Sequence, residues 1–150
     1  MTTIRPAVAG DLAALVALDA IAASDAARRE AIADWIRLGQ CHVAVGDDGQ
    51  PAGYVALTRS FFRSPFIEML QVAKPARRRG IGRNLVRHCI DLTPAEQKLW
   101  TSTNQSNTPM QALLPRLGFI RCGMFEHLDP GDPELIYLRW PGDRIPAPHV

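Results

Sequence analysis

The sequence is poor in three features that would each point to a particular class of protein. No apolar run in its 150 residues approaches the roughly 20 residues that a helix needs to cross a bilayer, so we expect no membrane partner. The N-terminus lacks a basic head followed by an apolar core and a small-residue cleavage site, which predicts no signal peptide. The formal net charge is only +2, too small for a broad nucleic-acid-binding surface.

Cysteine is also scarce, and the cysteines that occur do not form a sequence motif. The three cysteines are Cys41, Cys89 and Cys122. Their odd number and the absence of a Cys-x-x-Cys pair predict reduced thiols in a cytoplasmic protein. The histidines His42, His88 and His127 are scattered without the spacing of metal ligands, so we expect no metal site.

What the sequence does contain is typical of one soluble globular domain. Apolar residues make up 47% and charged residues 21% of the chain, and 150 residues are enough to bury a hydrophobic core. We expect this domain to span residues 1–140. The segment 141–150 carries three prolines and few apolar anchors, so we expect it to be an irregular tail.

Hydrophobic periodicity predicts a mixture of helices and strands. Short alternating or continuous apolar runs predict strands at 2–5, 41–45, 53–58, 66–72, 99–103, 119–127 and 134–140. Apolar residues at helical spacing predict helices from Asp11, from Asp25 to about Leu38, from Gly80 to about Ile90 and from Thr108 to Leu117. This order predicts an α/β fold, in which a sheet carries helices on both faces.

The segment between the strand predicted at 66–72 and the helix predicted from Gly80 carries a proline, three successive arginines and two glycines. It reads Ala73-Lys74-Pro75-Ala76-Arg77-Arg78-Arg79-Gly80-Ile81-Gly82-Arg83. A helix start leaves backbone N–H groups unpaired, glycine lets an anion approach them, and arginine adds charge-assisted hydrogen bonds. The combination predicts a loop that binds a pyrophosphate, with a basic turn before an ordinary helix as the alternative.

With these residues in place, the chain resembles the GNAT superfamily of acyl-coenzyme-A-dependent N-acetyltransferases. Residues 77–82 fit its phosphate loop, Gln/Arg-x-x-Gly-x-Gly/Ala, and residues 70–72 fit the end of its fourth strand. Asn107 lies eleven residues before the Gly118-Phe119 pair, and fits the asparagine that begins a family segment ending in Leu-Gly-Phe. The order of elements also matches, so the resemblance covers nearly the whole chain.

The resemblance implies a fold, a cosubstrate and a set of binding residues. The implied fold is a mixed, mostly antiparallel central sheet of about seven strands, flanked by about four helices and splayed between strands 4 and 5. Acetyl-CoA is the implied acetyl donor, an amine is the acceptor, and no metal is involved. The implied cofactor-binding residues are Leu70, Val72, Arg77, Arg78, Arg79, Gly80, Ile81, Gly82, Arg83 and Asn107.

The resemblance also assigns these residues their roles. Leu70 and Val72 would exchange main-chain hydrogen bonds with the pantetheine arm of the cosubstrate, which fills the splay like an added strand. The amides of residues 78–83 would hold the pyrophosphate, and Arg77 and Arg79 would either reach the phosphates or screen them. Asn107 would bond the pantetheine arm, although an asparagine before a helix is also an ordinary cap.

One carboxylate is a candidate for the general base. Glu68 is the only acidic residue of the strand predicted at 66–72, and period-2 alternation places it on the same face as Leu70 and Val72. Several members of the family carry a glutamate on this strand that removes a proton from the acceptor amine. The alternative is a structural carboxylate that is paired with a core arginine or a backbone donor.

The usual general acid of the family is missing. A tyrosine often stands four residues before the glycine of the Gly-Phe pair, and Leu114 occupies that position here. A thiolate leaves acceptably without a proton, and a water or a nearby hydroxyl could substitute for the tyrosine. The candidate hydroxyls are those of Ser102, Ser106 and Thr108.

Two functions of different classes are therefore open. The first is an N-acetyltransferase in which a primary amine, of a small molecule or of a protein, attacks acetyl-CoA directly in a ternary complex. The alternative, motivated by Leu114, is a noncatalytic acyl-CoA-binding or sensor module. The sequence leaves open the identity of the acceptor and the oligomeric state, a homodimer included.

Overall fold

A computed structural model describes residues 2–142, which form two compact units. The first unit comprises the residues up to 58 together with 68–89, and the second comprises 59–67 together with the residues from 90 onward. Strands β3 (Pro51–Phe61) and β4 (Ser64–Val72) contribute to both units. Most of the tail expected at 141–150 lies outside the described residues, so the boundary at residue 140 stays a prediction.

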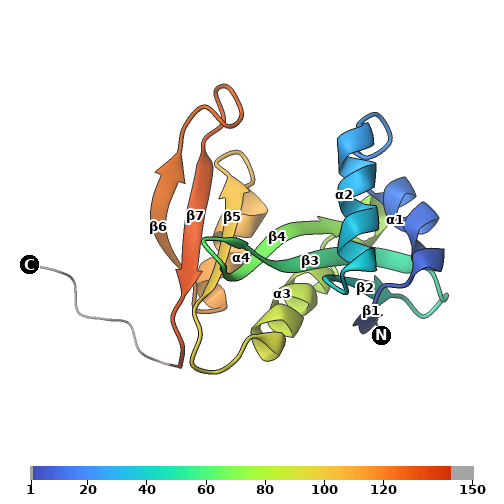
Figure 1. Ribbon diagram of the computed structural model, residues 1–150, viewed down its shortest axis with the longest axis horizontal. Coiled ribbons are helices and arrows are strands. Elements are labelled where there is room, and N and C mark those ends of the chain that lie inside the picture. The colour runs from blue at the N-terminus through green and yellow to red at the C-terminus, as the bar shows by residue number, and fades with distance from the viewer. Residues whose placement is uncertain (1, 143–150) are drawn as a thin grey trace, which may run out of the picture. The chain divides into compact units, whose positions relative to one another are not determined.

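The first unit contains strands β1 and β2, parts of β3 and β4, the helices α1 and α2, and most of α3 (Figure 1). Besides β3 and β4, its elements are β1 (Thr3–Pro6), η1 (Ala9–Asp11), α1 (Leu12–Leu18), α2 (Ala26–Arg37), β2 (Cys41–Val45), η2 (Lys74–Ala76) and most of α3 (Ile81–Leu92). Antiparallel ladders join β1 to β2 and β2 to β3. Asp25 begins α2 as predicted, because its carboxylate accepts hydrogen bonds from the amides of Ala27 and Arg28.

One face of the first unit's sheet is covered by α1 and α2 (Figure 1). The core between these layers consists of Ala7, Leu15, Ala22, Ile32, Trp35, Cys41, Val43, Tyr54 and Ala56. The strand residues in this core alternate along β2 and β3, as expected for side chains that share one face of a sheet. Burial of this apolar surface holds α1, α2 and the loop between them on the sheet.

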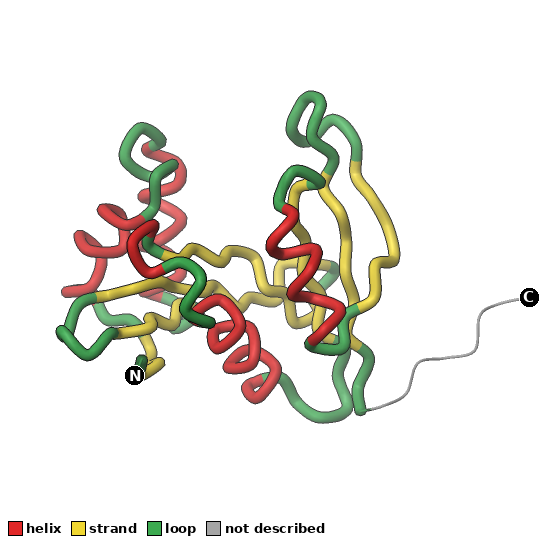
Figure 2. Tube along the Cα trace, turned by 180° about the vertical axis from the view of Figure 1, so that it is seen from behind, coloured by secondary structure: helices red, strands yellow, loops and turns green. Residues whose placement is uncertain are grey.

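The opposite face is covered by α3, which the reverse view brings forward (Figure 2). His88 of α3 meets His42 of β2, with 3.1 Å between Nε2 and Nδ1. Gly53 of β3 makes the close approach possible, because a Cβ there would lie 2.7 Å from the carbonyl oxygen of Gln71 and 3.3 Å from Cδ1 of Leu85. Gly53 therefore sets how closely the start of α3 lies on the strands.

The second unit is built on β5 (Leu99–Asn104), α4 (Thr108–Arg116), β6 (Ile120–Phe125) and β7 (Glu134–Arg139). Both β5 and β6 pair with β7 in antiparallel ladders. Within this unit the first part of β4 pairs with β5 in parallel, Phe66 opposite Trp100 and Ile67 opposite Thr101.

Hydrogen bonding orders the seven strands as β1-β2-β3-β4-β5-β7-β6. The parallel ladder between the fourth and fifth strands covers two residue pairs, and β4 then continues to Val72. The predicted class is confirmed: the sheet is mixed and mostly antiparallel, it is splayed between strands 4 and 5, and four α-helices flank it in the described residues.

The strand predicted at 53–58 is longer than expected and runs from Pro51 to Phe61. It forms a hairpin with β4 through a two-residue turn, in which Phe62 has a φ of 50° and Arg63 a φ of 61°. Positive φ at both central residues is the conformation of a type I′ turn. Local sequence does not predict this turn, because neither residue is the asparagine or glycine that such turns favour.

Candidate functional site

The loop that follows β4 exposes its main chain. After the short turn η2, Arg78 adopts a φ of 67° and Gly80 a φ of 77°. Glycine adopts this left-handed conformation without strain, whereas Arg78 must be held there by its surroundings. The carbonyl of Gly80 accepts the first hydrogen bond of α3, from the amide of Asn84 at 3.0 Å, so Gly80 is the residue that caps the helix.

The first turn of α3 has no side-chain cap, because Gly80 has no side chain. The amides of Ile81, Gly82 and Arg83 precede the first helical donor and so lack an acceptor within the helix. For the amides of residues 78–80 we also find no backbone acceptor in the described part of the chain. Consecutive unpaired amides at a helix start, reinforced by the helix dipole, form a site suited to an anionic group.

The end of β4 lies against this helix start. A Cβ on Gly82 would be 3.8 Å from Cγ2 of Val72 and 4.0 Å from Cδ2 of Leu70, which is ordinary van der Waals contact. Both strand residues are half-buried. The structure thus brings the loop, Leu70 and Val72 together within the first unit, as the sequence predicts for residues that hold one cosubstrate.

The four arginines of the loop, Arg77, Arg78, Arg79 and Arg83, are all exposed. Nε of Arg77 donates a hydrogen bond to the carbonyl oxygen of Val72 at 3.3 Å. The guanidinium of Arg83 turns back over Gly80, where a Cβ would lie 3.2 Å from its Nη2. The side chains of Arg77 and Arg83 therefore lie next to the end of β4 and to the unpaired amides, respectively.

A cleft of about 720 Å³ adjoins the loop within the first unit. Arg79, Ile81 and Asn84 line it on the loop side, while Asp47 and Asp48 line it on the side of the turn between β2 and β3. It contains two of the residues predicted to bind the cosubstrate. Its walls carry charges of both signs, so the cleft as a whole is not a pure anion site.

Glu68 is half-buried on β4, and its carboxylate is held by a residue that sequence reasoning missed. Oε1 of Glu68 accepts a hydrogen bond from Oγ1 of Thr58 at 3.0 Å. Thr58 comes from β3 and is only 5% exposed. No sequence signal could have found this partner, because it depends on the register of the β3–β4 hairpin. The bond orients the carboxylate, and it is also a bond that a structural carboxylate would make.

Asn107 belongs to the second unit and caps α4. Its Oδ1 accepts a hydrogen bond from the amide of Met110 at 3.3 Å, and the side chain is exposed. This is the ordinary cap that the sequence left as an alternative. The cap uses the side-chain oxygen of Asn107. The hydrogen bond from Asn107 to the pantetheine arm stays a prediction.

Leu114 is fully buried in the second unit, so it is a core residue and cannot exchange protons. Two of the three candidate hydroxyls already have partners: Ser106 is bonded to Asp132, and Ser102 contributes a hydrogen bond to Glu134. Thr108 is exposed at the first position of α4. None of the three takes the place of Leu114 in the helix.

Glu134, the first residue of β7, is a second half-buried carboxylate. Burial raises its pKa, the nearby charges of Asp129 and Asp132 raise it further, and the hydrogen bond from Ser102 acts in the opposite direction. Raised carboxylate pKa values are common where a group exchanges protons, although structural groups show them too. Glu134 is therefore a second titratable carboxylate to consider in this protein.

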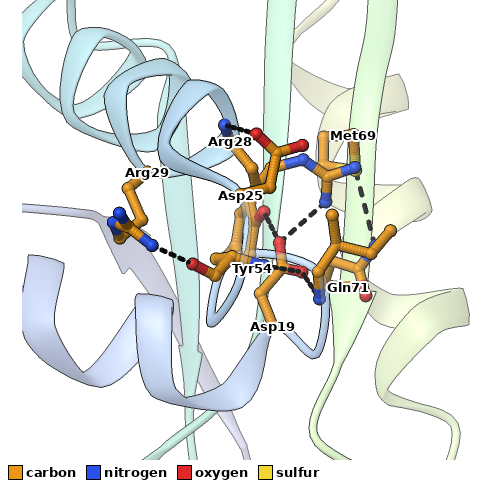
Figure 3. A network of polar contacts seen from close by, with 9 residues as sticks. Asp19, Asp25, Arg28, Arg29, Tyr54, Met69 and Gln71 are labelled. Carbon is orange, nitrogen blue, oxygen red and sulfur yellow. Dashed lines mark hydrogen bonds and ion pairs between the residues drawn. The ribbon is translucent and has the colours of Figure 1, made fainter.

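A buried polar network joins the loop between α1 and α2 to β3 (Figure 3). Asp19 is fully buried and accepts hydrogen bonds from the hydroxyl of Tyr54 at 2.7 Å and from Nη1 of Arg28 at 2.8 Å. The amide of Ile21 adds a third bond at 3.0 Å. Burial alone would raise the pKa of Asp19, but these hydrogen bonds and the arginine charge outweigh it and lower the pKa.

Other candidate chemistries find little support. In residues 2–142 no group of three or more His, Cys, Asp or Glu side chains is arranged to hold a metal ion. None of the three cysteines, all of them among the described residues, forms a disulfide bond, and burial raises the pKa of Cys41 and of Cys89 to about 12, so these two thiols are poor nucleophiles. The helices found in the same residues are too short or too polar to cross a membrane.

Comparisons with known proteins agree on one family. The model of the acetyltransferase (GNAT) family matches residues 12–119 of this chain. Streptothricin acetyltransferase from Streptomyces lavendulae is 38% identical over 85 residues, which are 55% of this chain and 45% of that protein. The chain thus matches about half the length of this relative.

Two further relatives match over more of their length. The peptidyl-lysine N-acetyltransferase YjaB of Salmonella typhimurium is 32% identical over 113 residues, 75% of this chain and 72% of that protein. The crystal structure of a GNAT-family acetyltransferase from Bacillus cereus is similar with a TM-score of 0.84 and 33% identity, covering 93% of this chain and 97% of that chain.

Proposed function

This chain belongs to the acetyltransferase (GNAT) family, and from that premise we propose that it transfers an acetyl group from acetyl-CoA to a primary amine of a small molecule or a protein. The observation that carries the proposal is the run of unpaired amides at residues 78–83 beside the end of β4. A pyrophosphate satisfies such amides, and an extended arm can add main-chain hydrogen bonds along a strand.

Family membership also favours catalysis over the noncatalytic alternative. Two of the relatives are named as enzymes, one a streptothricin acetyltransferase and the other a peptidyl-lysine N-acetyltransferase. The only feature that favours a sensor module is Leu114, and loss of an acid is tolerable when the leaving group is a thiolate. We therefore propose a primary amine as the acceptor. Assays with small-molecule amines and with peptides will show which kind of molecule bears it.

The proposed reaction is a direct transfer in a ternary complex. Glu68 accepts a proton from the acceptor ammonium, the free amine attacks the thioester carbonyl, and the C–N bond forms as the C–S bond breaks. The main-chain amide of Leu70 stabilises the developing oxyanion, and coenzyme A leaves as a thiolate. The second proton of the acceptor nitrogen passes through water to this thiolate, and Glu68 returns the first proton to solvent. Holding both substrates in place supplies a large part of the rate.

The arginines and Asn107 have supporting roles in the proposal. The side chain of Arg77 donates a hydrogen bond to the carbonyl oxygen of Val72. We propose that this side chain moves to a phosphate when the pantetheine arm donates a hydrogen bond to the same carbonyl. Arg78, Arg79 and Arg83 add positive charge around the amides, and Asn107 bonds the pantetheine arm. Cysteines without a disulfide bond are in keeping with a reducing compartment, and we propose that the reaction takes place in the cytoplasm.

A charge placed among the unpaired amides tests the loop. Gly82→Glu should weaken acetyl-CoA binding by about 100-fold, because the new carboxylate takes the amides and repels the pyrophosphate. Isothermal titration of the purified protein with acetyl-CoA and with coenzyme A measures this change. The fold should survive, since an acidic residue in the first turn of a helix is favourable.

Gly82→Ala is the matched control for this experiment. The added methyl group would meet Val72 and Leu70 at ordinary contact distance, so affinity should stay within about threefold of the unchanged protein. If Gly82→Glu binds acetyl-CoA as tightly as Gly82→Ala does, the loop is not the pyrophosphate site and the proposed function loses its main support.

The bond between Thr58 and Glu68 provides a test of positioning. Thr58→Val removes the hydroxyl at nearly constant shape and should lower kcat by about tenfold, while the KM for acetyl-CoA stays unchanged. Thr58→Ser retains the donor and should restore most of the rate. Melting temperatures of both variants show whether a lower kcat only reflects a less stable fold. Equal kcat values for Thr58→Val and Thr58→Ser would contradict a positioning role for the Thr58 hydroxyl.

A further inference from the structure

Strand β6 is the last strand of the sheet in the described residues, and apart from its bulge it lacks the proline and lysine that protect many edge strands. It ends the strand order, so only one of its sides is paired, with β7. All six of its residues are exposed. The segment 120–128 contains no proline and no lysine, the residues that most often keep edge strands from pairing.

The same segment concentrates exposed apolar surface. Nine large hydrophobic side chains are exposed in the described residues, and four of them lie between positions 120 and 128. They are Ile120 at 36%, Met124 at 43%, Phe125 at 44% and Leu128 at 62% exposure. Apolar side chains gathered on an unpaired edge strand mark a surface that associates with another strand.

The charges on β6 indicate which strand would fit. Arg121 on β6 and Glu126, the residue directly after β6, carry opposite charges and stand on either side of Met124 and Phe125. If a second copy of β6 pairs antiparallel with the first, the two-fold axis exchanges the ends of the strand. Arg121 of one copy can then lie opposite Glu126 of the other, and the same ion pair forms twice.

The bulge in β6 determines to which side of the strand the main-chain groups of Arg121 and Glu126 point. Arg121 lies opposite Tyr137 and Gly123 opposite Ile136, so Cys122 is an extra residue in the ladder. Counted in ladder steps, Arg121 and Phe125 are therefore three apart instead of four. If the pairing in the dimer extends β6 by one step to Glu126, Arg121 and Glu126 are four steps apart, and an even count turns their main-chain groups to the same side of the strand. Without the bulge, one of the two would face the partner strand and the other would face away.

We propose that β6 pairs antiparallel with β6 of a second copy of this chain, with the two-fold axis at Met124 and Arg121 opposite the partner's Glu126. In this register Gly123 lies opposite the partner's Phe125, so the largest side chain faces the smallest. The dimer continues the sheet through its open edge and covers the exposed apolar side chains of the strand.

A charge exchange tests both the dimer and its register. Sedimentation equilibrium of the full chain should show a monomer–dimer equilibrium, and Arg121→Glu or Glu126→Arg alone should weaken it by about tenfold or more, because the symmetry places two like-charge pairs in every dimer. The double variant Arg121→Glu/Glu126→Arg should restore the dimer. Met124→Lys, at the axis, should abolish it independently.

Each outcome counts for or against the proposal. The substituted side chains are exposed, so circular dichroism should show an unchanged monomer fold. A wild-type chain that stays monomeric at every concentration overturns the proposal, as does a dimer that none of the single variants weakens. A dimer weakened by both single changes but not restored by the double variant overturns the register.

Discussion

Replacing Glu68 with glutamine should lower kcat by about 10²–10⁴-fold at neutral pH, with acetyl-CoA affinity unchanged. Glutamine has the same shape, and its amide oxygen can still accept the hydrogen bond from Thr58, so the local structure should persist. What is lost is the ability to take a proton from the acceptor ammonium. Coenzyme A release with an accepted amine, followed by a thiol-reactive reagent, measures the rate, and calorimetry measures acetyl-CoA binding.

Glu30→Gln is the matched control, because Glu30 is an exposed carboxylate on α2 that has no role in the proposed reaction. Its kcat should equal that of the unchanged protein. The pH profile adds a second readout: if Glu68 is the base, the variant should regain activity as pH rises and the acceptor amine deprotonates without help. Full activity of Glu68→Gln at neutral pH would instead identify Glu68 as a structural carboxylate and direct attention to Glu134.

Replacing Asp19 with alanine should destabilise the protein by about 3–5 kcal/mol, because it breaks a buried ion pair. The change leaves the fully buried hydroxyl of Tyr54 without its acceptor and the guanidinium of Arg28, 16% exposed, without its counter-charge. Denaturant unfolding followed by circular dichroism gives the free energy of unfolding for both proteins.

Asp34→Ala is the control for this change, since Asp34 pairs with Arg37 on the surface, where the two side chains are 61% and 68% exposed. Its cost should be below about 1 kcal/mol. If Asp34→Ala and Asp19→Ala cost the same, the buried network does not contribute to stability as we expect.

The contribution of Asp19 should also depend on pH. Its pKa is lowered in the folded protein relative to the ordinary value of about 3.9 for an unfolded chain, so the unfolded state binds the proton more readily. The stabilisation is therefore fully present above the unfolded value and is lost as pH falls through the lower folded value. The difference in unfolding free energy between the unchanged protein and Asp19→Asn should shrink over that acidic window and stay constant near neutrality.

Several features of the site follow from local sequence and could be predicted without a structure. The loop of residues 78–83 depends on where a strand ends, where a glycine starts a helix and where cations stand, and each of these is a short-range property. The structure agrees, since Gly80 caps α3 and the next amides are unpaired. Asn107 was likewise predicted at a helix start, and it caps α4 there.

Other features depend on contacts between residues that are distant in the chain. Thr58 holds Glu68 only because a turn of two unusual residues, Phe62 and Arg63, sets the pairing of β3 with β4. Asp19 lies 35 positions before Tyr54, and their hydrogen bond requires the α1–α2 loop to dock on β3. A one-residue change of register would turn Thr58, Glu68 or Tyr54 to the other face of its strand, away from its partner.

The sequence by itself therefore determined the family and the fold class, and it predicts an anion-binding loop after β4, because glycine, arginine and hydrophobic spacing act over a few residues. Only the tertiary structure decided which groups surround the candidate base, which carboxylate is buried with an arginine, and which sheet edge stays open. These depend on strand register and on the close packing of helices against the sheet, which long-range burial sets and local sequence does not encode.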